Sequence, residues 1–113
     1  SVIIISAVLE FGSEAERDAA ARGSADLQRA TREEEPGCLA YCFGIDPVEP
    51  TRIQVFEQWE DAAALDAHFV HPNYTNMRTF LHGAGLVQSS AEKYRIDAVA
   101  PVYNADRKAT AEF

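Results

Sequence analysis

The chain has 113 residues, a length that corresponds to one domain. Apolar residues make up 47% and charged residues 25% of it, which is ordinary for a globular protein with its own core. Its formal net charge of −8 argues against acidic partners, so we expect it to bind neither nucleic acid nor an anionic membrane surface. No apolar run reaches the roughly 18 residues of a membrane helix, and the first residues lack a secretory signal pattern.

The two cysteines, Cys38 and Cys42, fall within one predicted strand. At about 3.3 Å per residue they stand roughly 13 Å apart, too far for a disulfide between them. Two cysteines also do not provide the ligand set of a metal site. We therefore expect reduced, buried thiols, as in a cytoplasmic protein, and no metal ion.

The first half of the chain predicts a strand followed by a long helix. Residues 2–9 are almost continuously apolar and β-branched, which is typical of a strand covered on both faces. The helix is expected over residues 13–34, because Ser13 and Glu16 form a capping box and Pro36-Gly37 follows its end. One face carries small residues suited to close packing on a sheet: Ala15, Ala19, Gly23, Leu27 and Ala30.

Two further strands are expected over residues 38–45 and 52–59, paired antiparallel through the short loop between them. In the first of these strands, alternation places Leu39, Tyr41 and Phe43 on one face and the two cysteines on the other. Both faces are apolar, so we expect both to be covered.

The second half predicts two short helices and a final strand. Asp61 is a plausible N-cap for the first helix, and Pro72 suits the first position of the second, which Gly83 ends. The last strand is expected over residues 90–99, followed by a tail over residues 101–113. The resulting order, β-α-β-β-α-β, is the ferredoxin-like α+β arrangement with an antiparallel sheet, formed as a single domain whose core spans about residues 2–100.

This arrangement has helices enough to cover only one face of its sheet. The other face needs a second layer, and a second copy of the same sheet supplies it most simply. We therefore predict a homodimer through the sheet face.

Three sequence motifs resemble the antibiotic biosynthesis monooxygenase domain of the dimeric α/β-barrel superfamily. They are the EPGCL segment at residues 35–39, the strand motif Glu57-x-Trp59, and a helix pattern that leads through His68 to His71-Pro72-x-Tyr74. The resemblance covers about residues 2–100. It implies a ferredoxin-like chain, paired sheet to sheet, with a pocket between each sheet and its helices.

The family's activities include cofactor-free oxygenases of anthrones and quinols, haem-degrading enzymes and a sugar-phosphate isomerase, and the fold does not choose among them. The anthrone oxygenases carry an Asn where this chain has Val55 and a Tyr where it has Leu65, so only Trp59 of their catalytic set is reproduced. The haem degraders carry an axial His near the position of Arg78, which argues against haem degradation here.

Trp59 and Glu57 are the first candidate site residues, both at the end of a predicted strand. Trp59 either fills the core or forms an aromatic wall whose indole N–H reaches a substrate oxygen. Glu57 either makes a structural hydrogen bond or acts as a general base, with Arg52, Arg78 or Arg95 as its partner.

His68 is the main candidate for chemistry, because it lies beside the buried stripe of its helix and imidazole titrates near neutral pH. A structural histidine is the alternative. His71 either caps the next helix or contacts the substrate, and Tyr74 either packs in the core or donates into a pocket. Three further residues are expected in the wall of the substrate site: Met77, Arg78 and Phe80.

These residues lead to one main hypothesis and two alternatives. The main hypothesis is a cofactor-independent monooxygenase that acts on a small aromatic molecule of quinol or anthrone type. The first alternative is an isomerase or proton-transfer enzyme for a small sugar-derived or dicarbonyl compound. The second is a non-catalytic, stress-related dimer that binds a small ligand.

Overall fold

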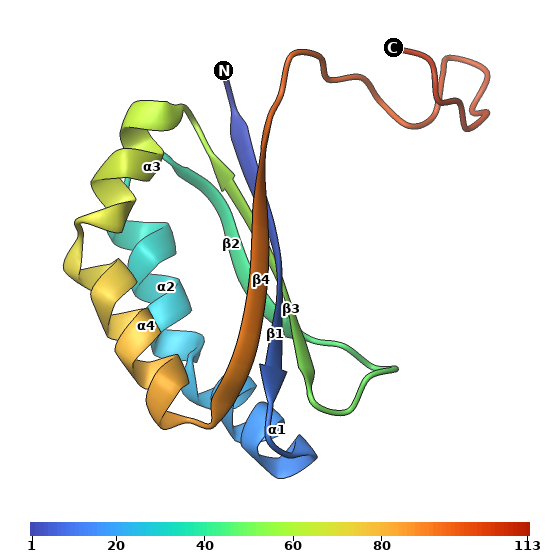
Figure 1. Ribbon diagram of the computed structural model, residues 1–113. Coiled ribbons are helices and arrows are strands. Elements are labelled where there is room, and N and C mark those ends of the chain that lie inside the picture. Colours follow the sequence, from blue (N-terminus) through green and yellow to red (C-terminus); the bar gives the residue numbers. More distant parts are fainter.

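The computed structural model describes residues 1–113 and shows a single antiparallel sheet with helices packed on one of its faces (Figure 1). The four strands lie in the order β2-β3-β1-β4. The predicted ferredoxin-like α+β fold is thereby confirmed. The elements in chain order are β1 (Ile3–Phe11), α1 (Glu14–Gly23), α2 (Ala25–Glu34), β2 (Cys38–Ile45), β3 (Arg52–Trp59), α3 (Ala62–Phe69), α4 (Pro72–Gly83) and β4 (Leu86–Arg95).

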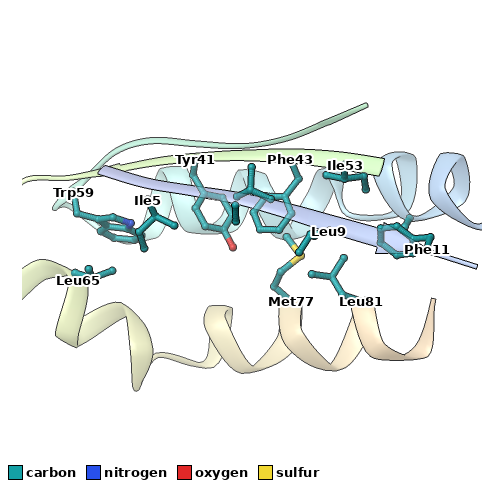
Figure 2. Close-up of a cluster of buried hydrophobic side chains, with 13 residues drawn as sticks. Ile5, Leu9, Phe11, Tyr41, Phe43, Ile53, Trp59, Leu65, Met77 and Leu81 are labelled. Atoms are coloured by element: carbon teal, nitrogen blue, oxygen red, sulfur yellow. The ribbon is translucent and has the colours of Figure 1, made fainter. Parts of the chain in front are cut away.

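Strand β1 is central and fixes the register of the sheet. It pairs antiparallel with β3, where Ile5 lies opposite Glu57, and with β4, where Ile5 lies opposite Lys93. Side chains alternate between the faces of a sheet, so Ile5 and Glu57 both point toward the helices. Figure 2 shows the resulting core, in which the sheet side chains face Leu65 of α3 and Met77 and Leu81 of α4.

The long helix predicted over residues 13–34 is divided into α1 and α2 at Ser24. Ser24 is completely buried, and its hydroxyl donates to the Ala21 carbonyl. A Gly-Ser pair such as Gly23-Ser24 is a common place for a helix to bend. The predicted start is confirmed, because the Ser13 hydroxyl accepts the backbone N–H of Glu16 at 3.1 Å.

The face that α1 and α2 turn to the sheet is not the predicted one. Ala15, Ala19 and Gly23 are exposed, and the buried residues are Arg17, Ala20, Ser24, Gln28 and Thr31. Two of these polar side chains, Gln28 and Arg17, bind backbone atoms of edge strand β2 and of the loop that follows it. Gln28 donates to the carbonyl of Phe43 on edge strand β2 and accepts its N–H, and one Arg17 nitrogen donates to three carbonyls of the β2–β3 region.

A β-bulge changes the predicted alternation of β2. The register shifts between Cys38 and Ala40, so Cys38 packs toward the core while Leu39 is 53% exposed. Tyr41 and Phe43 face the helices as predicted. Both cysteines are free, which agrees with the expected lack of a disulfide, but Cys42 is exposed rather than buried.

The face of the sheet opposite the helices is uncovered in this single chain (Figure 1). Phe56 of β3 and Tyr94 of β4 are 43% and 49% exposed there. Strand β4 begins and ends four residues earlier than predicted, and the tail beyond it extends away from the body, with an isolated bridge between Tyr103 and Ala109. The second sheet layer remains a prediction.

Candidate active site

A cavity of about 460 Å³ lies between the sheet and helices α3 and α4. Most of its wall is apolar, with Ile5 and Leu9 from β1, Val55 from β3, and Met77 and Leu81 from α4. In Figure 2 the Tyr41 hydroxyl points from the sheet toward α4, across this space. An apolar chamber with few polar groups is the usual form of a small-molecule site.

His68 is a buried histidine in the wall of this cavity. Its side chain comes from the last turn of α3, is 1% exposed and lines the cavity. The Nδ1 atom lies 2.9 and 3.1 Å from the two carboxylate oxygens of Glu35, which is itself buried. A carboxylate only accepts hydrogen bonds, so this contact fits the tautomer whose proton is on Nδ1. Burial lowers the pKa of His68 below its usual value, against the opposing effect of Glu35, so the ring is neutral at pH 7.

Aromatic rings hold the His68 imidazole in place. The Trp59 ring lies 4.4 Å from it at an interplanar angle of 34°, and Tyr41 and Tyr74 meet it edge-on at 5.7 and 5.4 Å. Trp59 is fully buried and does not line the cavity. The indole therefore supports the histidine from behind and is not itself a substrate wall.

Glu57 is a second ionisable group in the wall of the cavity. It lines the cavity, and its Oε1 accepts the indole N–H of Trp59 at 3.0 Å. Burial raises the pKa of Glu57 to about 7, because the single indole hydrogen bond does not offset the loss of water. Glu57 can therefore exchange a proton at neutral pH. None of the three arginines predicted as its partner pairs with it, and Arg52 binds Glu10 instead.

Hydroxyl and cationic groups complete the polar part of the wall. Burial raises the pKa of Tyr41, so its phenol remains a hydrogen-bond donor. Arg78 and His82, one turn apart on α4, lie on the exposed side of the cavity, and Arg78 donates to the Tyr74 hydroxyl at 3.4 Å. The hydrogen-bond donors of Tyr41, Tyr74 and Arg78 therefore line a chamber in which Glu57 is the only acidic residue.

The structure divides the predicted site residues into two groups. Five of them line one cavity: His68, Glu57, Tyr74, Met77 and Arg78. Trp59, His71 and Phe80 do not. His71 caps α4, since its Nδ1 accepts the Asn73 N–H at 3.0 Å. The Phe80 ring packs against Gly23 of α1, not in the cavity wall.

Sequence reasoning missed Glu35, Asn73 and Tyr41. Glu35 was considered only as part of the EPGCL motif, in which nothing distinguishes its carboxylate from one on the protein surface. No group of three or more His, Cys, Asp or Glu side chains is arranged to hold a metal ion. No helix combines the length and apolar composition that crossing a membrane requires.

Fold and site together define a ferredoxin-like protein with a mostly apolar cavity between its sheet and its helices, lined by the ionisable side chains of His68 and Glu57. The sequence pattern of the family described as antibiotic biosynthesis monooxygenase matches residues 3–79, well over half of the chain. The chain belongs to this family.

Solved structures agree with this assignment. A crystal structure described as antibiotic biosynthesis monooxygenase is 29% identical, with a TM-score of 0.70 over 87% of this chain and 99% of that one. A protein from Deinococcus radiodurans, provisionally named for the same family, is 20% identical with a TM-score of 0.78 over 90% and 99% of the two chains, which shows a shared fold. An uncharacterized Synechocystis protein is 45% identical over 40 residues, which span 35% of this chain and only 27% of that protein.

Proposed function

We propose that this protein is a cofactor-independent monooxygenase of a small aromatic substrate of quinol or anthrone type. The observation that carries the proposal is the pair of proton-transfer groups on one apolar cavity, His68 held by Glu35 and Glu57 held by Trp59. Family membership supports the oxygenase class. The two groups differ at pH 7, because His68 is a neutral base while Glu57 is partly protonated.

The residues fit an oxygenation in which the substrate itself reduces O₂. His68 Nε2 takes a proton from the acidic C–H of an anthrone, and the resulting anion passes one electron to O₂. The substrate radical and superoxide combine to form a C–O bond, and protonated Glu57 gives the peroxide its proton. Glu57 then takes the second C–H proton as the O–O bond breaks, and hydroxide leaves with the proton held by His68. One oxygen atom ends in the new carbonyl and the other in water.

The wall would select the substrate by shape and charge. Its apolar side chains and Met77 suit flat rings, and the donors on Tyr41, Tyr74 and Arg78 suit a carbonyl or phenolate oxygen. Desolvation in such a chamber strengthens each of these hydrogen bonds.

Oxygen uptake tests the proposal. Wild type, His68→Gln and Glu57→Gln are compared on a panel of anthrones and quinols, with Glu34→Gln as a control because Glu34 is an exposed glutamate outside the cavity. Loss of a general acid or base should reduce kcat by roughly 10²–10⁴-fold, and the control should keep the wild-type rate. Uptake that never exceeds the background rate, or that both variants retain, would contradict the proposal.

Proton transfer without oxygen is the alternative that the same two groups favour. An isomerase needs one base and one acid on opposite sides of a carbonyl compound, and neither His68 nor Glu57 requires O₂ for that role. Incubation with dihydroxyacetone or pentane-2,4-dione in D₂O under nitrogen would show it as C–H exchange that His68→Gln abolishes.

A non-catalytic, ligand-binding dimer predicts a histidine bound only to backbone and a cavity filled by side chains. His68 instead binds a carboxylate and borders an open chamber, so this reading has less support. We propose in addition that the chain works as a homodimer through the uncovered sheet face, where Phe56 and Tyr94 are exposed.

A further inference from the structure

The Glu35 carboxylate links helices α3 and α4 through hydrogen bonds. It accepts from the His68 ring on α3 and from the Asn73 side-chain amide on α4, the latter at 3.2 Å. Its side chain is buried, and 33 residues separate it from His68 in the chain. A buried carboxylate is costly unless its oxygens are bonded, and these two partners meet that need.

The EPG segment explains how Glu35 reaches this position. Pro36 disfavours helical geometry in the residue before it, and Glu35 is extended, with φ −109° and ψ 102°, at the end of α2. That geometry turns its side chain away from the helix axis and toward α3.

Gly37 allows α3 to approach. A Cβ at Gly37 would overlap the Cβ of Ala64, one turn before His68 on α3. The Gly37 carbonyl also accepts the N–H of Glu60, just before that helix begins, at 2.9 Å. Any larger residue would push α3, and with it the imidazole, away from the carboxylate.

We propose that Glu35 is the positioning residue of this site, which selects the Nδ1–H tautomer of His68 and so directs the Nε2 lone pair to the cavity, with Pro36 and Gly37 as the backbone device that sets the contact. Only one part of this inference rests on the proposed function, namely that Nε2 takes a proton from the substrate. Glu35 does not line the cavity, so it acts through His68.

No other charged or titratable neighbour of His68 is placed to select the tautomer of its ring. Tyr41 from the sheet and Tyr74 from α4 meet the ring edge-on, and Trp59 covers one face. His71, which lowers the pKa of His68, is bound to backbone through its own Nδ1. Only the Glu35 carboxylate forms a hydrogen bond to the His68 ring.

Long-range ¹H–¹⁵N NMR of the histidine rings tests the proposal without any substrate. Wild type should show a single His68 tautomer, with Nδ1 protonated. Glu35→Gln removes the negative charge and offers the ring either its amide oxygen or its NH₂, so it should give a mixture of tautomers, with the midpoint of the His68 titration at lower pH. Gly37→Ala leaves both partners chemically intact but separates them, and should shift the tautomer ratio in the same direction. Glu34→Gln is the matched control and should match wild type.

An unchanged tautomer and midpoint in both Glu35→Gln and Gly37→Ala would overturn the proposal. If the tautomer changes as expected, oxygen uptake then separates this inference from the proposed function. A tautomer change with a roughly 10²–10⁴-fold loss of kcat in Glu35→Gln supports both. If the variants change the tautomer but the wild type oxidises no anthrone or quinol, the positioning role of Glu35 stands and only the proposed substrate class is contradicted.

Discussion

Glu57 should make the protein less stable as the pH rises. Burial raises its pKa from 4.5 to about 7, so between these values the folded chain holds a proton that the unfolded chain has released. Stability falls with pH wherever the folded state binds more protons. The full difference, at roughly 1.4 kcal/mol per tenfold change in proton affinity, corresponds to about 3 kcal/mol, present below pH 4.5 and lost by pH 7.

Glu57→Gln isolates this effect, because the amide is neutral at every pH and its carbonyl can still accept the Trp59 indole N–H. The free energy of unfolding is measured with urea at fixed protein concentration between pH 4.5 and 8. The variant and wild type should agree within about 1 kcal/mol at pH 4.5, and the variant should be more stable by about 3 kcal/mol at pH 8. A difference that is constant across this range, or of opposite sign, would refute the reasoning that places a desolvated carboxyl in the cavity.

Three further outcomes follow from the packing. Trp59→Phe removes the one donor to Glu57, so the carboxyl pKa should rise above about 7, visible by ¹³C NMR, whereas an unchanged pKa would mean that the indole bond is unimportant. Gln28→Ala leaves the buried Phe43 N–H without its acceptor, and urea unfolding should show a loss of about 1–3 kcal/mol. Phe56→Asp puts a charge on the uncovered sheet face and should shift sedimentation from dimer to monomer. A monomeric wild type would contradict the proposed homodimer.

The fold could be predicted because the residues that begin and end its helices act on their near neighbours in the sequence. Ser13 and Asp61 cap helices, and Pro72 begins one, through contacts with residues only two or three positions away. The inward face of α1 and α2 could not be predicted in the same way. Gln28 and Arg17 are buried because they satisfy the backbone of a strand edge and a loop, a demand that exists only after the sheet has formed. A pattern of apolar residues therefore cannot predict that a polar side chain is buried to bind backbone.

The bulge in β2 shows a second limit. Strict alternation predicts that Leu39 and Tyr41 share a face, and a single extra residue between Cys38 and Ala40 exposes Leu39 while Tyr41 stays buried. The extra residue reverses the facing of Cys38 and Leu39 relative to Tyr41 and the residues after it, and nothing in the composition of the strand marks the place. The exposure of Cys42 is a different case, because Cys42 lies on the predicted face of the sheet and that face is uncovered in this chain.

The sequence predicted the ionisable residues of the candidate site but not their partners, for a physical reason. His68 and Glu57 stand out because ionisable side chains on otherwise apolar stripes must find partners or change their pKa. The identity of those partners is a tertiary property, so the arginines were the wrong expectation for Glu57. Glu35 lay hidden because a carboxylate before Pro-Gly at a helix end is ordinary on a protein surface. Its importance emerges only when Pro36 sets its backbone, Gly37 admits α3, and the imidazole arrives within 2.9 Å. Within the EPGCL motif, Pro36 and Gly37 therefore act by placing the Glu35 carboxylate against His68.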